Sequence, residues 1–368
     1  MNDQSRLARL LPLLESDPGN LTLLADAAET ALDEGRPEVA AELIDGYSGD
    51  EALPPSATNL RGLAAMRLGD FAGAAETFET MMAGGVDDPT VRFNLAWAKA
   101  MTKDEEGALG LLDDSLSEER ADAAMLQVQL LHARGDFDEA AERARRYVDL
   151  HPGHRGLMAA TSVLALDVED AALAERCAAA AGDHPDALAT LGTLALVEDR
   201  GAEATELFER ALAANSGVPR AWIGRGLARL VSGENELASD DLDRGAEMFG
   251  DHLGSWIAAG WAWFVRNDLG AARARFERAL ALDPTFAESH GSLAVVDLLE
   301  GDVEGARKGA DVALRLDRNC FSAALAQTLL AAGSGDRESA RRIFDLAANR
   351  PIDASGRTIA QALAKVAL

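Results

Sequence analysis

The side chains that usually carry catalysis are scattered along this chain and do not form a known motif. Cys177 and Cys320 lie far apart and outside any CxxC pattern, so neither a disulfide framework nor a zinc site is indicated. The six histidines include no HExxH pair, and no phosphate-binding glycine loop or GxSxG turn is present. His151 and His154 are close in sequence, but a metal site normally needs three or four ligands. The sequence therefore predicts no catalytic residue, no metal and no cofactor.

Aromatic side chains offer a different chemistry, which is non-covalent recognition. Phe93 and Trp97 are four residues apart, and Trp261 and Phe264 are three apart, so each pair shares one face if these segments are helical. Exposed aromatic side chains commonly anchor a bound partner. The alternative is that both pairs are buried against neighbouring elements, because aromatic stripes often belong to a core.

Charge limits the kind of partner that is expected. The chain carries 62 acidic and 35 basic side chains, for a formal net charge of -27. Because nucleic acids and anionic membranes are polyanions, we expect neither as a partner. A protein or peptide with basic and apolar side chains is the natural partner, although acidic residues also simply keep an alanine-rich surface solvated.

The elements that position these residues are predicted to be helices. Hydrophobic residues make up 48% of the chain and aromatic residues only 5%, which suits close-packed helices better than strands. The N-terminal segment lacks the apolar stretch of a signal peptide, and no run approaches the ~18 apolar residues of a membrane span. We therefore expect an all-α cytoplasmic protein without membrane insertion.

Small core residues recur along most of the chain at intervals of 31 to 34 residues. Many open the pattern A-x3-F-x2-A, whose positions share one helix face, so that a small residue admits a neighbouring helix and the larger residue fills the gap. The series predicts ten helical hairpins over roughly residues 21–353. Its members are Ala40, Ala74, Ala108, Ala140, Leu173, Ala204, Ala238, Ala272, Ala306 and Ala340.

Glycine marks both the first helices and the turns of these hairpins. Gly62, Gly192, Gly226 and Gly260 fall inside predicted first helices, where glycine costs about 1 kcal/mol relative to alanine, so their recurrence implies close helix approach. Three turns share one glycine-aspartate sequence, in which the glycine is expected to take a left-handed conformation and the aspartate to cap the second helix. These pairs are Gly69 and Asp70, Gly135 and Asp136, and Gly301 and Asp302.

Residues 253–286, LGSWIAAGWAWFVRNDLGAARARFERALALDPTF, resemble one tetratricopeptide repeat. The residues at the family's spacing are Trp256, Ala259, Gly260, Trp263, Ala272, Phe276, Ala279 and Pro284. The resemblance implies a right-handed α-solenoid of about ten repeats over residues 21–353, with capping helices in residues 1–20 and 354–368. The shorter steps in residues 140–204 indicate a bend, with a tolerated indel as the alternative.

In this family, the concave surface comes mostly from the first helix of each hairpin. The resemblance therefore implies that partner contacts fall at the corresponding positions here. These are Phe93, Trp97, Met125, Gln129, Arg220, Ile223, Ile257, Trp261 and Phe264. The family's carboxylate clamp for an acidic chaperone tail is not expected, because the chain has only four lysines and the clamp positions hold residues such as Asn59 and Phe93.

The function that we expect is a non-catalytic scaffold or adaptor that binds a protein or peptide segment in its groove. One alternative is a chaperone-like component of a secretion or envelope-assembly pathway, which would need a fully apolar groove. Another is an enzyme whose solenoid shapes a small-molecule pocket, which would need a deep cavity with convergent polar groups. Self-association through an exposed groove or an imperfect cap is left open.

Overall fold

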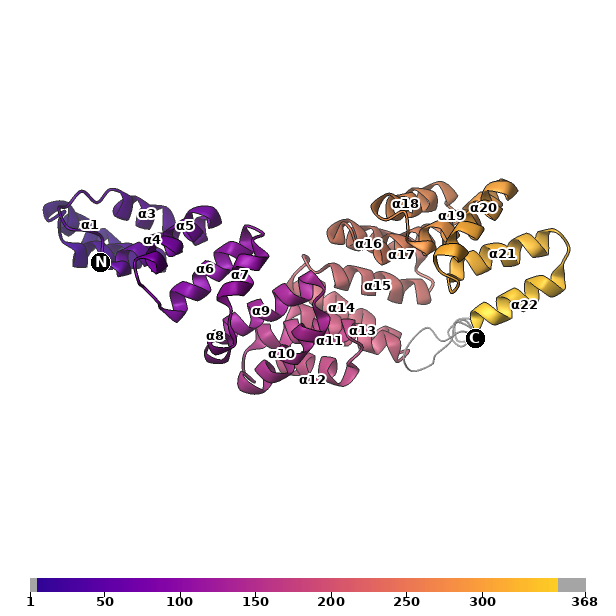
Figure 1. Cartoon of the computed structure of the whole chain (residues 1–368), viewed down its shortest axis with the longest axis horizontal. Helices are drawn as coiled ribbons and strands as arrows, with labels where there is room; N and C mark the ends of the chain where they lie inside the picture. The colour runs from indigo at the N-terminus through magenta and orange to yellow at the C-terminus, as the bar shows by residue number, and fades with distance from the viewer. Residues whose placement is uncertain (1–4, 350–368) are drawn as a thin grey trace. The chain divides into compact units, whose positions relative to one another are not determined.

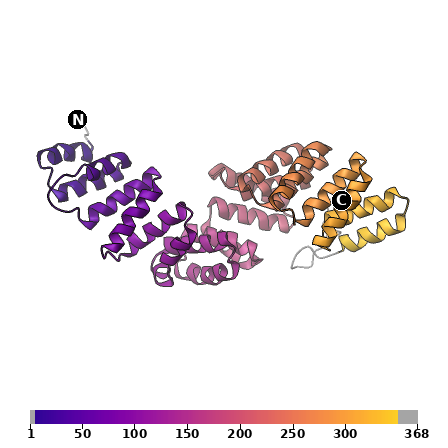
Figure 2. The same ribbon diagram turned by 45° about the horizontal axis from the view of Figure 1, so that its top comes forward.

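The computed structural model describes residues 5–349, and Figures 1 and 2 show these residues as helices joined by short turns. The chain forms two compact units, residues 1–164 and 165–368. The boundary between them falls inside helix α11 (Arg155–Asp167). Among the described residues there is no strand, so the prediction of an all-α fold is confirmed.

Unit 1 begins with a single helix that is followed by helical hairpins. Its helices are α1 (Arg6–Ser16), α2 (Leu21–Asp33), α3 (Pro37–Asp45), α4 (Pro55–Leu68), α5 (Phe71–Ala83), α6 (Pro89–Met101), α7 (Glu105–Leu111), α8 (Asp114–Glu119), α9 (Ala121–Arg134) and α10 (Phe137–Leu150), followed by most of α11. Leu7 of α1 is fully buried against α2 and α3. A capping role for residues 1–20 stays a prediction.

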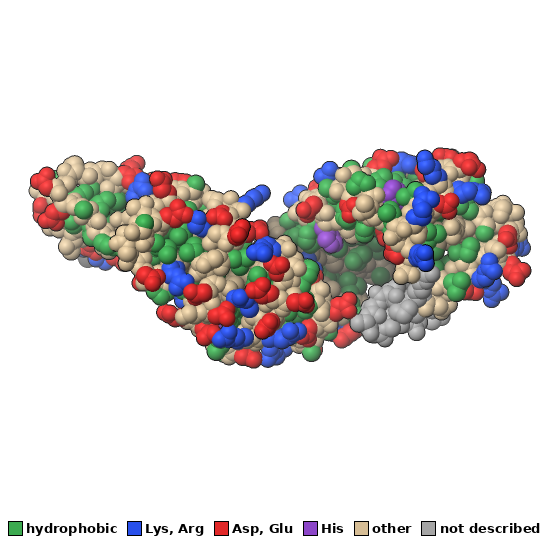
Figure 3. Space-filling model, viewed as in Figure 1, with side chains coloured by type: hydrophobic (Ala, Val, Ile, Leu, Met, Phe, Trp, Pro, Cys, Tyr) green, Lys and Arg blue, Asp and Glu red, His purple; other side chains and the backbone are tan. Residues whose placement is uncertain are grey.

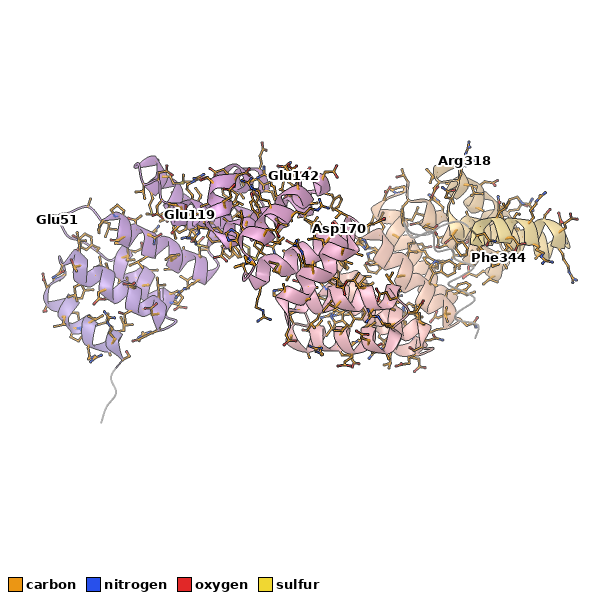
Figure 4. The ribbon with its side chains drawn as sticks, turned by 90° about the horizontal axis from the view of Figure 1, so that it is seen from below. Glu51, Glu119, Glu142, Asp170, Arg318 and Phe344 are labelled. Carbon is orange, nitrogen blue, oxygen red and sulfur yellow. The ribbon has the colours of Figure 1, made fainter. Side chains whose placement is uncertain are left out.

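Unit 2 contains the later hairpins. Its helices are α12 (Ala171–Ala181), α13 (Pro185–Val197), α14 (Gly201–Ala214), α15 (Pro219–Val231), α16 (Asn235–Phe249), α17 (Leu253–Val265), α18 (Leu269–Leu282), α19 (Ala287–Glu300), α20 (Val303–Leu316), α21 (Phe321–Gly333) and α22 (Arg337–Ala348). Asp170, labelled in Figure 4, begins α12 by accepting a hydrogen bond from the Leu173 amide at 3.1 Å. The predicted capping helix in residues 354–368 lies outside the described residues.

The described part of the chain holds ten hairpins in the predicted register. The small residue that opens each second helix is buried, from Ala40 in α3 to Ala340 in α22. Within each unit, first helices pack along the second helix of their own hairpin, as α15 does with α16 and α19 with α20. The boundary between the units falls within the irregular residues 140–204, and the bend expected there stays a prediction.

Glycines in the first helices admit the bulky residues of the second helices, as the sequence predicted. Gly260 of α17 lies so close to the buried Phe276 of α18 that a Cβ atom would overlap the ring. Phe208 of α14 touches glycines of two hairpins. A Cβ atom at Gly192 of α13 would lie 2.7 Å from its Cε1 atom, and one at Gly224 of α15 would overlap its ring.

Two of the three predicted aspartate caps form. Gly69, Gly135 and Gly301 have φ values of 79°, 80° and 92°, as expected for left-handed helix ends. Asp70 and Asp302 accept hydrogen bonds from the amides three residues on, at 2.9 and 2.8 Å. The expected cap at Asp136 is wrong, because its carboxylate pairs with Arg134 at 3.0 Å instead.

The third hairpin departs from the regular pattern, since its second helix is broken into α7 and α8. Ala108 and Leu112 are buried at their predicted positions, but α7 ends at Leu111. Asp113 then caps α8, with its Oδ1 atom accepting from the Leu116 amide at 2.8 Å. The buried Gln127 of α9 donates to the Leu112 carbonyl. Aspartate favours a helix start over a helix interior, which explains the break.

Candidate partner-binding surfaces

Four of the predicted contact residues lie in unit 1, on the neighbouring first helices α6 and α9. Phe93 and Trp97 are half-buried, with their ring centroids 6.0 Å apart. Both pack against a cluster that includes Leu126 and Leu130 of α9. The Arg120 guanidinium lies 5.2 Å from the centre of the Phe93 ring. These aromatic rings therefore support the next hairpin and keep only part of their surface accessible.

On α9, the two predicted residues differ in exposure. Met125 is half-buried, and its sulfur approaches Gly156 of α11 closely enough that a Cβ atom there would lie 2.7 Å away. Gln129 is exposed. Because α6 and α9 contact each other, the aromatic pair and these two side chains belong to adjacent first helices of unit 1.

The other predicted residues lie in unit 2, on α15 and α17. Ile223 packs against Gly245 of α16, where a Cβ atom would lie 2.6 Å from its Cδ1 atom. Trp261 meets Phe264 and Phe276 edge to face, with centroid distances of 4.9 and 5.5 Å. Ile257, Trp261 and Phe264 all pack on a cluster that contains Val296 of α19. These residues are half-buried, so each joins hairpins together and also reaches the surface.

Arg220, the one charged residue in the predicted set, is engaged within unit 2. Its Nη2 atom lies 2.6 Å from Oδ2 of Asp167 in α11. Nearby His252 caps α17, and burial followed by the positive charge of Arg220 lowers the pKa of this histidine. The charge of Arg220 is thus partly neutralised by Asp167.

The structure also shows an exposed apolar row in unit 2 that the sequence reasoning missed. Val197, Val231, Val265 and Leu299 are 51%, 61%, 56% and 53% exposed. Each is the last or next-to-last residue of a first helix, in α13, α15, α17 and α19 respectively. We call these four residues the terminal row. Their constant spacing of 34 residues is the signal that could have revealed them.

Acidic side chains follow the terminal row in the turns between first and second helices. In unit 2 these turns and the helix starts after them carry more acidic than basic residues, and Figure 3 shows acidic and apolar side chains close together on the visible surface. Arg200 pairs with two of these acids, Glu198 and Glu203. The acidic members are Glu198, Asp199, Glu203, Glu234, Glu236, Asp268, Glu300, Asp302 and Glu304.

Two buried polar clusters fix the helices of unit 2. The side chain of Asp241 in α16 is only 5% exposed, and its two carboxylate oxygens accept hydrogen bonds from Arg225 at 2.7 and 2.8 Å. Arg229 joins the same carboxylate at 2.7 Å. In the next hairpin, the Trp263 indole donates to Asp243 at 2.9 Å, and Arg275 pairs with that aspartate at 2.6 Å. Charge-assisted bonds of this kind hold α15, α17 and α18 to α16.

The break between α7 and α8 leaves a cavity of about 450 Å³ in unit 1, lined by residues that include Gln127, Arg134 and Arg143. Arg143 pairs with Asp114 at 2.7 Å and with Glu139 at 2.9 Å. Arg134 pairs with Asp136, outside the lining. The charged groups of the cavity are therefore engaged with each other or with neighbours.

Cys320, at the start of α21, is predicted to be unreactive in the folded protein. Burial, helped by the nearby Glu288 carboxylate, raises the pKa of its thiol to about 12. Because the thiolate is the nucleophile, a Cys177→Ser variant at pH 8 should react with a disulfide reagent at least ~100-fold more slowly when folded than in denaturant. Measuring release of the thiolate chromophore in both states checks this. Equal rates would show that α21 opens readily.

Stacked helical hairpins with accessible first helices define a helical-repeat scaffold, a class that works through non-covalent contacts and implies a role in protein interaction. A family model described as tetratricopeptide repeat matches residues 25–83, 59–118, 189–252 and 257–319. These matches cover more than half of the 368 residues, and the chain belongs to the tetratricopeptide repeat family. No curated protein matches the sequence.

Solved structures with a similar fold include two of the protein IFIT1. A monomeric mutant of IFIT1 with Gppp-AAAA is 12% identical, with 92% of this chain and 93% of that chain covered and a TM-score of 0.53. The human IFIT1 dimer with PPP-AAAA is 12% identical, with 94% of both chains covered and a TM-score of 0.54. MamA is 19% identical over 42% of this chain and 91% of that chain, with a TM-score of 0.36.

These comparisons correct one prediction about partners. The sequence argument excluded nucleic acid because of the net charge of -27. That exclusion is wrong, because IFIT1 has the same fold and was solved with the oligonucleotides Gppp-AAAA and PPP-AAAA. Net charge describes the whole chain, whereas binding depends on the local surface.

No helix in the described range is long and apolar enough to cross a membrane.

Proposed function

We propose that this protein is a non-catalytic scaffold that binds a protein or peptide segment along the first-helix face of its hairpins. The observation that carries the proposal is partial exposure of apolar side chains on that face in both units, including Trp97 in α6 and Trp261 in α17. Each of these side chains is held in place by packing from the next hairpin, so the face is preorganised. Preorganised aromatic side chains bind without a large loss of conformational freedom.

The proposed partner segment carries apolar and basic side chains. Apolar side chains would cover Ile257, Trp261 and Phe264, while basic ones would meet the acidic turns of unit 2. Such binding weakens as salt screens the exposed charges but persists through its apolar contacts. Salt sensitivity also separates this scaffold from the chaperone-like alternative, whose fully apolar groove would bind equally well at any ionic strength.

Site-specific photo-crosslinking tests the proposal directly. A photoreactive phenylalanine analogue placed at Gln129 or Leu227, both exposed on first helices, should form protein adducts in extracts of the native source. The matched control is the same analogue at Ala274, which is exposed on the second helix α18. It should give far fewer adducts, because second helices do not form the proposed surface.

Treatment of the adducts distinguishes the outcomes. Adducts that are shortened by protease and unaffected by nuclease support a protein partner. Adducts that disappear with nuclease, or equal labelling from Ala274, would contradict the proposal.

A further inference from the structure

We propose that the terminal row of unit 2 is the docking edge for an amphipathic helix with lysine or arginine beside its apolar face. This inference rests on the proposed function and names the partner's shape and chemistry. The four side chains Val197, Val231, Val265 and Leu299 are each more than half exposed. Their apolar surface remains in water in the folded unit, so covering it is favourable by roughly 25 cal/mol per Å².

The row runs across neighbouring helices. Helix α13 contacts α15, α15 contacts α17, and α17 contacts α19. Packed helices lie about 8–10 Å apart, so successive members of the row are separated by roughly 10 Å and all four span roughly 30 Å. An α-helix of about 20 residues has this length.

The spacing favours a helical partner over a strand. Two turns of an α-helix advance about 11 Å. Apolar residues at i and i+7 on one face of a partner helix therefore match successive members of the terminal row. Side chains on one face of a β-strand recur at about 7 Å, which does not match the step of roughly 10 Å between successive members of the row. Leu196, Leu230, Phe264 and Leu298, which precede the members of the row in sequence, are half-buried and apolar.

Charge complementarity identifies the polar side of the partner. The row is followed in the chain by exposed acids at each turn, namely Glu198, Glu234, Asp268 and Glu300. Arg266, the nearest basic residue after Val265, is half-buried over the Trp263 ring at 4.3 Å. Glu198 and Glu300 are already paired within the unit, with Arg200 and Arg273 at 2.5 and 2.6 Å, so Glu234 and Asp268 at the centre of the row are the acids that would attract lysine and arginine and repel glutamate-rich helices.

A designed peptide tests the docking edge. The probe is a fluorescent 20-residue peptide with leucine at i, i+3, i+4 and i+7 and lysine elsewhere, measured by anisotropy against the full chain. Three matched peptides carry scrambled leucine spacing, glutamate in place of lysine, or two central prolines that break the helix. We expect the parent peptide to bind at least tenfold more tightly than each of the three.

Variants locate the binding on the molecule. The double variant Val231→Asp with Val265→Asp should weaken parent-peptide binding at least tenfold, because it places charge inside the apolar contact. The control variant is Leu316→Asp, which changes a 44% exposed apolar residue at the end of second helix α20 and should leave binding unchanged. Exposed sites tolerate such changes with little loss of stability, and thermal unfolding of each variant confirms that the fold is kept.

Each outcome supports or overturns the proposal that the terminal row is a docking edge for a helix. Unchanged binding by the double variant, or equal binding of the proline-containing peptide, overturns the inference. Tight binding of oligoadenylate that competes with the peptide and is lost in the double variant would instead assign the edge to nucleic acid. If crosslinking from Gln129 and Leu227 still yields protein adducts while the double variant binds the peptide normally, the scaffold stands and only the docking edge fails.

Discussion

Replacing Gly260 with leucine should lower the free energy of unfolding of unit 2 by about 3 kcal/mol. The new side chain would begin in space already filled by Phe276, which is fully buried between α17 and its neighbours. Because an aromatic ring cannot bend aside as a flexible chain does, the two helices of the hairpin must separate. Urea unfolding followed by circular dichroism measures the loss as a shift in midpoint.

Two further variants make this result specific. Gly201→Ala, at the start of α14, introduces a Cβ atom with nothing within 4 Å and should leave stability unchanged or slightly increased. Adding Phe276→Ala to Gly260→Leu should recover part of the loss, since the two side chains compete for one space. An unchanged midpoint for Gly260→Leu would show that the hairpin register assigned to α17 and α18 is incorrect.

The second large effect is expected at Asp241. Replacing it with asparagine removes the negative charge that Arg225 and Arg229 share, while both guanidinium groups remain about 15% exposed or less. Leaving buried charges without a partner typically costs about 3–5 kcal/mol. We expect about 3 kcal/mol here, since Glu209 lies 3.6 Å from Arg229 and compensates in part.

The control that tests whether burial causes the effect at Asp241 is the variant Asp345→Asn in α22. Asp345 forms an exposed pair with Arg341 at 3.7 Å, with side chains 59% and 86% exposed, so its loss should cost less than ~0.5 kcal/mol. Both variants are measured by urea unfolding in the same buffer. Similar effects at the two sites would mean that the Asp241 cluster is solvated in solution.

The hairpin register could be predicted from sequence because it depends on residue size at fixed spacing. Ala272, Phe276 and Gly260 must sit where they do for two helices to approach closely, and the structure places them there. Turn glycines such as Gly69 were predictable for a similar reason, since their φ values exclude most other residues. The left-handed turn recurs in other hairpins without glycine, since Lys103, Glu169, Asp199 and Asn267 also have φ values of 57° to 65°, so sequence marks the turn only where glycine occupies it.

Contacts that depend on geometry between elements were not predictable in the same way. The ion cluster at Asp241 joins residues 12 and 16 positions apart, with no short motif to mark it. The break after Leu111 depends on two adjacent aspartates, Asp113 and Asp114, overriding a pattern that otherwise continues. That Trp97 and Trp261 line a binding groove stays a prediction. Both rings also pack against buried clusters of their units.

Phe208 occupies one hydrophobic site that two hairpins share, with Gly192 on one side and Gly224 on the other. Sharing a residue between hairpins limits which insertions and deletions the array can accept. At this junction, a duplication or deletion that shifts either helix by a residue would set Phe208 against a side chain larger than glycine, so whole-hairpin changes are the ones that preserve it. The intervals of 34 residues that run from Ala204 to Ala340 are what such a history of whole-unit copying would leave behind.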